Sequence, residues 1–138
     1  MTDRTPGFAW LTFEQVVEFH DRNVAIFGGP SGIRDAALLQ SALDRPRNKW
    51  AYGEGSISKL AAAYAFGIAK NHPFVDGNKR TAFIAMAVFL LANGHCLVAS
   101  QDDATAAMLA LASGTLSEDG LAAWLEAHTA AVSPDLTG

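Results

Sequence analysis

The sequence predicts an all-α fold: a single-domain compact helical bundle of about six helices with a central buried helix. Half of the 138 residues are hydrophobic, alanine and leucine are frequent, and β-branched runs are few, so helices should dominate. Apolar residues recur at helical spacing between glycine and proline breaks. The length suits a single core, so we expect residues 1–138 to form one domain with a disordered tail at 133–138.

The first helix has start and stop signals. Thr12, followed three residues later by Gln15, is a capping-box pattern, in which each side chain accepts a hydrogen bond from a free backbone N–H group of the first turn. The helix should run to about Phe27, where Gly28 and the glycine after it can end it. Residues 30–32 then indicate a turn.

A second helix is predicted from about residue 35 to residue 45. Pro46 should stop it, because the proline ring disfavours helical geometry in the residue before it. Residues 46–55, with two cations, two aromatic residues and two glycines, are then expected to form a mobile loop. A third helix follows over residues 57–71.

The fourth helix, over residues 78–93, is the predicted centre of the fold. Residues 81–92 are uncharged and apolar all round, which indicates burial, and they fall short of the roughly twenty residues that a bilayer requires. A short extended link at 97–98, a helix over about 102–112 and a last helix over about 117–128 complete the chain, with a serine as the N-cap of the last one.

The connection between the third and fourth helices holds the charged residues that suggest chemistry. Residues 72–80 read His-Pro-Phe-Val-Asp-Gly-Asn-Lys-Arg. The peptide N–H groups of Gly77 and Asn78 belong to the first turn of a helix, where donors lack intrahelical partners and can bind an anion. Lys79 and Arg80 would be repelled by the helix dipole unless a polyanion were bound, so this turn is a predicted phosphate site.

Two further residues of the same connection suit phosphate chemistry with a metal. Asp76 would repel phosphates unless a hard cation lay between them, which makes it the predicted Mg²⁺ ligand. His72 ends the preceding helix, and a neutral imidazole can take a proton from an attacking hydroxyl, which makes it the predicted general base. Each residue taken singly also has a structural interpretation as a cap or a solvated charge, but their joint spacing favours function.

These nine residues resemble the signature of the Fic/Doc superfamily, H-P-F-x-(D/E)-G-N-x-R, with every fixed position present. Residues 29–35, 38–43 and 60–64 resemble flanking segments of its death-on-curing (Doc) branch, so the resemblance covers most of the chain. Members that transfer AMP usually carry a small residue between the asparagine and the arginine. This chain has Lys79 there, as Doc-type toxins do.

The resemblance implies a Doc-type toxin of a type II toxin–antitoxin module, a protein kinase that uses ATP and Mg²⁺ to phosphorylate elongation factor Tu on a threonine and so inhibits translation. Its site would comprise a catalytic His72, a metal-binding Asp76, and the ATP- and phosphate-binding residues Gly77, Asn78, Lys79 and Arg80. Lys79 would shift the register of the nucleotide so that its γ-phosphoryl group faces the histidine. AMP transfer to a protein hydroxyl is the alternative reaction.

The resemblance also predicts partners. Autoinhibited relatives carry an S/T-x-x-x-E-G/N stretch, and the nearest approach here, at 115–120, has Asp119 in place of glutamate, so restraint should come from a separate antitoxin that covers an exposed apolar groove. In the superfamily the position of residues 46–55 resembles the flap that docks the target peptide. Arg47, Trp50 and Tyr52 are therefore candidate docking residues, with an ordinary surface loop as the alternative.

Charge and composition argue against other classes of protein. Ten lysines and arginines against fourteen aspartates and glutamates give a net charge of −4, so a DNA-binding helical module, the remaining alternative, would lack its basic face, and we expect no direct nucleic acid binding. The one cysteine can form no internal disulfide, and residues 1–12 hold no continuous apolar core of a signal peptide. We therefore expect a cytoplasmic protein without membrane contact.

Overall fold

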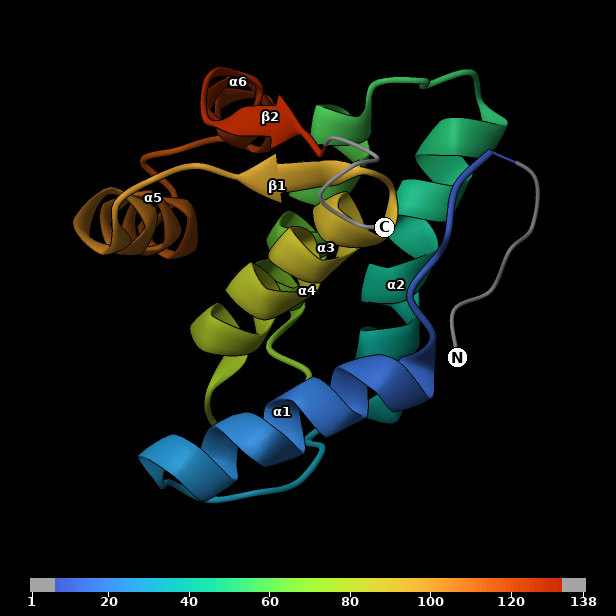
Figure 1. Ribbon diagram of the computed structural model, residues 1–138. Coiled ribbons are helices and arrows are strands. Elements are labelled where there is room, and N and C mark those ends of the chain that lie inside the picture. Colours follow the sequence, from blue (N-terminus) through green and yellow to red (C-terminus); the bar gives the residue numbers. More distant parts are fainter. Residues whose placement is uncertain (1–6, 133–138) are drawn as a thin grey trace.

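The computed structural model describes residues 7–132, which form six α-helices and one two-stranded sheet (Figure 1). The helices are α1 (Phe13–Phe27), α2 (Ala36–Ala51), α3 (Ile57–Asn71), α4 (Asn78–Ala92), α5 (Gln101–Ser113) and α6 (Glu118–Ala127), and the strands are β1 (His95–Leu97) and β2 (Thr129–Ala131). The predicted all-α bundle is confirmed. The tail expected to be disordered, 133–138, lies outside the described residues.

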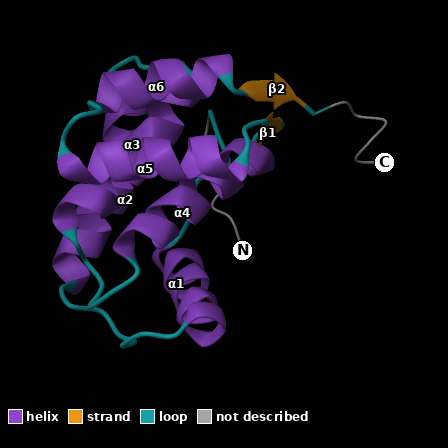
Figure 2. Ribbon diagram, turned by 90° about the vertical axis from the view of Figure 1, so that its left-hand side faces the viewer, coloured by secondary structure: helices purple, strands orange, loops and turns teal. Residues whose placement is uncertain are grey.

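Helix α3, rather than α4, is the most buried element. Ten of its residues are buried, and it packs against α2, α4 and α6. In both ribbon views α1 lies at one end of the bundle and α6 at the other (Figures 1 and 2). The predicted all-round burial of residues 81–92 is wrong, because α1, α5 and β1 only partly cover the face that α4 turns away from α3, and Leu91 is 59% exposed.

Helix α2 continues through Pro46 to Ala51, so the predicted stop at Pro46 is wrong. Proline has no N–H group for the carbonyl of Ala42, four residues earlier. At this point α2 lies against Gly67 of α3, so closely that a Cβ on the glycine would come within 3.0 Å of Ala42 Cα and 3.2 Å of its oxygen. This packing and the burial of Pro46 stabilise the helix past the proline, a case in which tertiary contacts override local propensity.

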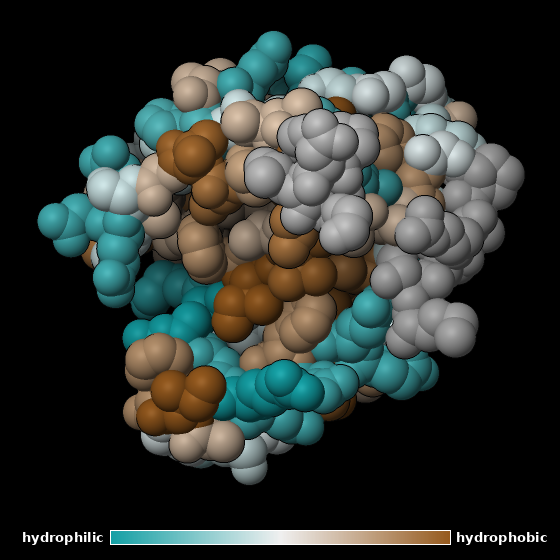
Figure 3. All heavy atoms as spheres, in the orientation of Figure 1, coloured by the Kyte–Doolittle hydropathy of each residue, from teal (hydrophilic) through white to brown (hydrophobic). Residues whose placement is uncertain are grey.

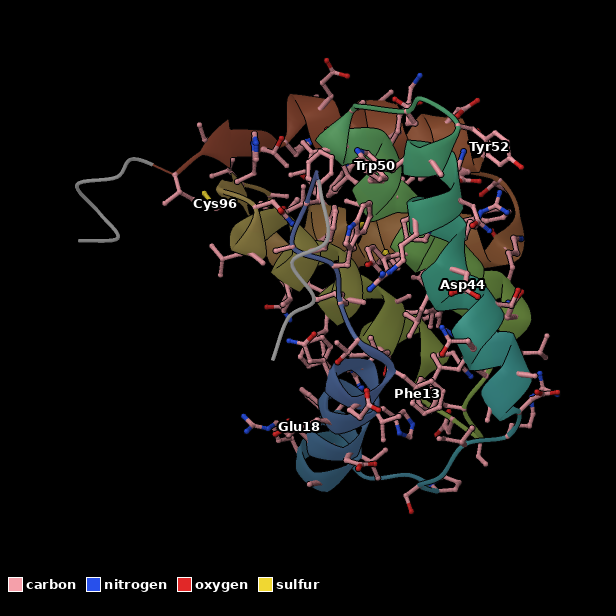
Figure 4. All side chains as sticks on the ribbon, turned by 90° about the vertical axis from the view of Figure 1, so that its right-hand side faces the viewer. Phe13, Glu18, Asp44, Trp50, Tyr52 and Cys96 are labelled. Carbon is pink, nitrogen blue, oxygen red and sulfur yellow. The ribbon has the colours of Figure 1, made fainter. Side chains whose placement is uncertain are left out.

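Most of the loop expected at 46–55 is therefore helical. The ring of Trp50 lies 6.0 Å from the ring of Trp10, and the guanidinium of Arg47 lies 5.7 Å from the same Trp10 ring. Tyr52, just past the end of α2, is 93% exposed and points away from the body at the end of the molecule opposite α1 (Figure 4). Two of the three candidate docking residues thus belong to a packed helix rather than to a loop.

The capping predictions are confirmed. The Gln15 N–H donates to Thr12 Oγ1 (3.2 Å) and the Thr12 N–H donates to Gln15 Oε1 (2.9 Å), which closes the capping box of α1. Ser117 caps α6 by accepting from the Gly120 N–H (2.9 Å). Strand β2, which the sequence did not predict, pairs antiparallel with β1. No helix within residues 7–132 is both long and apolar enough to cross a membrane.

Candidate active site

The signature loop, residues 72–80, begins where α3 ends. His72 is the C-cap of α3 and has a left-handed backbone conformation, with φ 49° and ψ 55°. Within residues 7–132 it is the one residue other than glycine with a positive φ. This conformation costs an L-residue about 1–2 kcal/mol, and such strain is commonly retained at functional sites.

The segment between α1 and α2 holds the signature loop through main-chain hydrogen bonds. The N–H groups of Arg34 and Asp35 both donate to the carbonyl of Pro73, at 2.7 Å and 3.0 Å. The Val75 N–H donates to the carbonyl of Gly32 at 3.1 Å. Two connections far apart in the sequence therefore form one unit, and the position of the loop depends on both.

The side chain of Arg34 completes this attachment. Its Nε donates to the carbonyl of His72 (2.6 Å) and its Nη2 donates to the carbonyl of Asn71 (2.8 Å). Both carbonyls lie at the end of α3, where the last oxygens of a helix have no intrahelical donor and the helix dipole favours a cation. Arg34 thus satisfies the backbone on both sides of the strained His72.

The side chain of Asn78 is committed to the loop itself. It is 5% exposed, its Oδ1 accepts from the Phe74 N–H (3.0 Å), and its Nδ2 donates to the Phe74 carbonyl (2.9 Å). Nδ2 also lies 3.3 Å from His72 Nδ1. Because an amide NH₂ group only donates, Nδ1 is the acceptor, and a neutral ring carries its proton on Nε2.

Helix α1 packs against the signature loop and hydrogen-bonds to its backbone. The ring of His20, fully buried, stacks on Phe74 with centroids 3.9 Å apart and planes 6° apart. Its Nε2 lies 2.7 Å from the carbonyl oxygen of Asp76 and donates to it. His20 belongs to none of the sequence motifs, and in the structure it supports the backbone of Asp76, the predicted metal ligand.

The phosphate-binding turn predicted at the start of α4 has the expected backbone geometry. Gly77 is the N-cap with φ 76°, and the first helical hydrogen bond runs from the Thr81 N–H to the Gly77 carbonyl (3.0 Å). The N–H groups of residues 78–80 therefore lack intrahelical acceptors and are available to an anion. A Cβ on Gly77 would meet Asn23 and His20 at ordinary contact distances, 3.6 Å and 3.7 Å, so the positive φ and not a lack of space favours glycine here.

All six residues predicted from the signature loop as catalytic, metal-binding or phosphate-binding line one cavity of about 960 Å³, which α1, α4 and α5 enclose. They are His72, Asp76, Gly77, Asn78, Lys79 and Arg80. The docking candidates Arg47, Trp50 and Tyr52 do not line it, and their docking role stays a prediction. The cavity combines exposed cations with apolar walls, a combination suited to a nucleotide with a charged and an apolar end.

A divalent cation would meet one carboxylate here. No cluster of three or more metal-ligating side chains occurs within residues 7–132. Mg²⁺ commonly binds through one or two carboxylates, retained waters and phosphate oxygens, so a lone Asp76 beside a phosphate site fits Mg²⁺ better than zinc. Gly29 leaves room for this carboxylate, because a Cβ there would lie 2.8 Å from Asp76 Oδ2.

Sequence reasoning missed the contribution of α1. His20, Asn23 and Phe27 recur at helical spacing on the side that faces the loop. Asn23 is 4% exposed, lines the cavity, and its Oδ1 has no hydrogen-bond partner. The sequence did contain a signal for this contribution: His20 and Asn23 are polar residues at positions of the apolar stripe of an amphipathic helix.

Replacing His20 with phenylalanine should lower the free energy of unfolding by about 1–3 kcal/mol, because the Asp76 carbonyl would lose its donor while the stacked ring is kept. Replacing it with alanine should lower it further by removing the ring as well. Urea unfolding of the two variants and the parent measures both steps. Equal stability of the phenylalanine variant and the parent would show that the hydrogen bond contributes nothing.

Comparison with known proteins is consistent with this site. The profile of the Fic/DOC family matches residues 10–90. The chain is 44% identical over 79 residues to "Toxin Doc" of Mycolicibacterium smegmatis, which covers 55% of this chain and 60% of that protein. It is 33% identical over 82 residues to "Protein kinase doc" of Escherichia phage P1, which covers 59% of this chain and 65% of the phage protein. The matched segments thus span less than two thirds of either relative.

Proposed function

Because the chain belongs to the Fic/DOC family, we propose that it is a Doc-type toxin that transfers the γ-phosphoryl group of Mg²⁺–ATP to a protein hydroxyl. The observation that supports this most strongly is the convergence of His72, Asp76 and the cationic start of α4 on one cavity. The relative from phage P1 is named a protein kinase, and the mycobacterial relative is named a toxin.

In the proposed reaction the hydroxyl oxygen of the target attacks the γ-phosphorus. The bond from the γ-phosphorus to the β–γ bridging oxygen breaks, ADP leaves, and the hydroxyl proton passes to His72. The backbone N–H groups of residues 78–80 and the side chains of Lys79 and Arg80 would hold the phosphates. When bound to Asp76, Mg²⁺ would neutralise charge on the phosphate oxygens.

His72 can take the hydroxyl proton through Nε2 only in the tautomer whose Nδ1 carries the ring proton. In the structure its Nδ1 accepts from Asn78 Nδ2 at 3.3 Å, which leaves the neutral ring with its proton on Nε2. A contact of this length is weak, so the ring can give it up at small cost. Binding of the target hydroxyl would then favour the tautomer whose Nε2 is free to accept the proton.

Lys79 favours phosphoryl over AMP transfer. Lys79 is exposed and lines the cavity beside Arg80. Its long cationic side chain would take the space that one phosphate group occupies in an enzyme with a small residue there. The nucleotide would then bind one phosphate further out, with its γ-phosphorus near His72. AMP transfer is the second candidate function, supported by the family signature that the two reactions share.

Replacing Lys79 with glycine should therefore increase transfer of AMP at the expense of phosphoryl transfer. The measurement is protein labelling by ATP carrying its label on the α- or the γ-phosphate, compared between the variant and the parent. A variant that keeps ATP affinity and γ transfer unchanged would contradict the register argument. A variant that loses all ATP affinity would also count against it.

The proposed target is elongation factor Tu, modified on a threonine so that translation stops in the cytoplasm. The proposed partner is an antitoxin that covers the cavity, since three exposed apolar side chains lie on its walls: Phe27, Val75 and Leu109. Growth arrest on expression, relieved by co-expression of a neighbouring gene, would support both roles. Growth that is unaffected by expression of the intact chain would argue against a toxin.

The decisive experiment incubates the purified protein with a bacterial lysate and ATP labelled on the α- or the γ-phosphate. The proposal predicts a protein band labelled from γ-ATP only, with dependence on Mg²⁺. Label from α-ATP would establish AMP transfer instead. The absence of any labelled protein, together with no calorimetric heat on titration of Mg²⁺–ATP, would refute both reactions.

A further inference from the structure

Helix α1 ends in an aromatic residue that contributes little to the hydrophobic core. Phe27 is the last residue of α1, is 62% exposed, and lines the cavity of the candidate active site. Hydrophobic atoms gather over this end of α1, at the lower left of Figure 3, beside hydrophilic ones. Its neighbour Ile26 is 73% exposed and does not line the cavity. Burial therefore does not explain the aromatic ring at position 27.

The ring of Phe27 contacts the guanidinium of Arg80, whose Cζ lies 3.9 Å from the ring centroid. This is the shortest cation–π distance within residues 7–132, where the next is 4.8 Å, from Arg45 to Phe66. No carboxylate of that part of the chain forms an ion pair with Arg80. The aromatic face thus occupies the place that an acidic side chain often takes beside an exposed arginine.

The chemistry of the two kinds of partner differs. A carboxylate binds the edge of a guanidinium and uses the N–H donors that a phosphate would need. An aromatic ring binds the flat face and leaves the five in-plane N–H donors free. A ring therefore fixes the position of Arg80 without competing with an anion for its hydrogen bonds.

We propose that Phe27 is a positioning residue that preorganises Arg80 for the polyphosphate tail of the nucleotide. The inference rests on the proposed function, in which Arg80 binds phosphate. Fixing the guanidinium before the ligand arrives removes the entropy that a free arginine would lose on binding. The effect acts on binding in the ground state and the transition state alike, so it should change KM and leave kcat almost unchanged.

The test compares three variants with the parent. Phe27→Leu keeps an apolar side chain and removes the ring, Phe27→Tyr keeps the ring, and Ile26→Ala is the control at the neighbouring exposed position. We expect the dissociation constant and KM for Mg²⁺–ATP to rise about two- to fivefold in Phe27→Leu, as an exposed cation–π contact would give. Phe27→Tyr and Ile26→Ala should match the parent.

Two further measurements separate this role from direct stacking on the nucleobase. Inorganic tripolyphosphate, which has no base, should lose the same affinity in Phe27→Leu. In the Arg80→Ala background, Phe27→Leu should have no further effect, because the two residues act through one contact. The inference would be overturned if Phe27→Leu lost affinity for ATP but kept its affinity for tripolyphosphate. It would also be overturned if the effects of Phe27→Leu and Arg80→Ala on affinity were additive.

The outcomes distinguish the two proposals. If the parent binds Mg²⁺–ATP and Phe27→Leu binds it equally tightly, the positioning role is refuted and the proposed function stands. If the parent binds neither ATP nor tripolyphosphate, the proposed function fails and takes this inference with it. Circular dichroism and urea unfolding of Phe27→Leu should match the parent, since the ring is mostly exposed.

Discussion

Replacing His72 with asparagine should lower the rate of phosphoryl transfer by about 10²- to 10⁴-fold while leaving the fold intact, because asparagine cannot act as a base at neutral pH. Asparagine tolerates the left-handed conformation of this C-cap better than other residues with a side chain, so the turn should survive. The Arg34 hydrogen bond to residue 72 uses the backbone carbonyl and is also retained. Growth arrest on expression should disappear with the activity.

The measurement is γ-phosphate transfer at saturating Mg²⁺–ATP, with urea unfolding as the check on stability. His95→Asn is the matched control, since His95 is half-buried in β1 and does not line the cavity. Transfer at the parental rate in the His72 variant would remove this residue from its catalytic role. Loss of transfer together with a lower free energy of unfolding would instead indicate a structural role at the end of α3.

Replacing Asp76 with asparagine should have the next largest effect, a loss of about 10²-fold or more in transfer rate at low Mg²⁺. A metal ion on transferring phosphates contributes several kcal/mol, and about 1.4 kcal/mol corresponds to a tenfold change in rate. The substitution keeps the side-chain shape beside Gly29 and leaves the main-chain carbonyl that accepts from His20. The fold should therefore be retained.

A titration of transfer rate against Mg²⁺ concentration checks this prediction. The Asp76 variant should need a higher Mg²⁺ concentration for half-maximal rate, whereas a general electrostatic effect would shift the rate equally at all concentrations. Asp119→Asn makes the same chemical change at an exposed position of α6, away from the cavity, and should behave as the parent. An unchanged Mg²⁺ requirement in the Asp76 variant would assign the metal to other ligands.

Residues 46–51 are helical where the sequence predicted a loop. Pro46 predicted a loop, because a proline inside a helix normally removes a hydrogen bond and ends the helix. The helix continues because the same stretch of α2 packs closely against Gly67, which is distant from the proline in the sequence. Trp50 and Arg47 are consequently placed against Trp10 rather than beside the signature loop.

Local sequence determined most of the helix boundaries and the backbone conformation of the predicted phosphate-binding turn. Capping by Thr12 and Ser117, the positive φ of Gly77 and the order of charges from His72 to Arg80 each depend on residues a few positions apart. Hydrogen bonds of that range form from the chain's own propensities, so a single sequence suffices to predict them.

Only the tertiary structure decided which distant groups complete the site. Arg34 on the end of α3, His20 beneath Asp76 and Phe27 beside Arg80 all come from the first quarter of the chain and meet the loop across the bundle. Such contacts depend on how α1 packs against α4, which burial of the whole core sets and no local pattern encodes. The backbone conformation of the loop was therefore predictable from sequence, and the distant residues that support it were not.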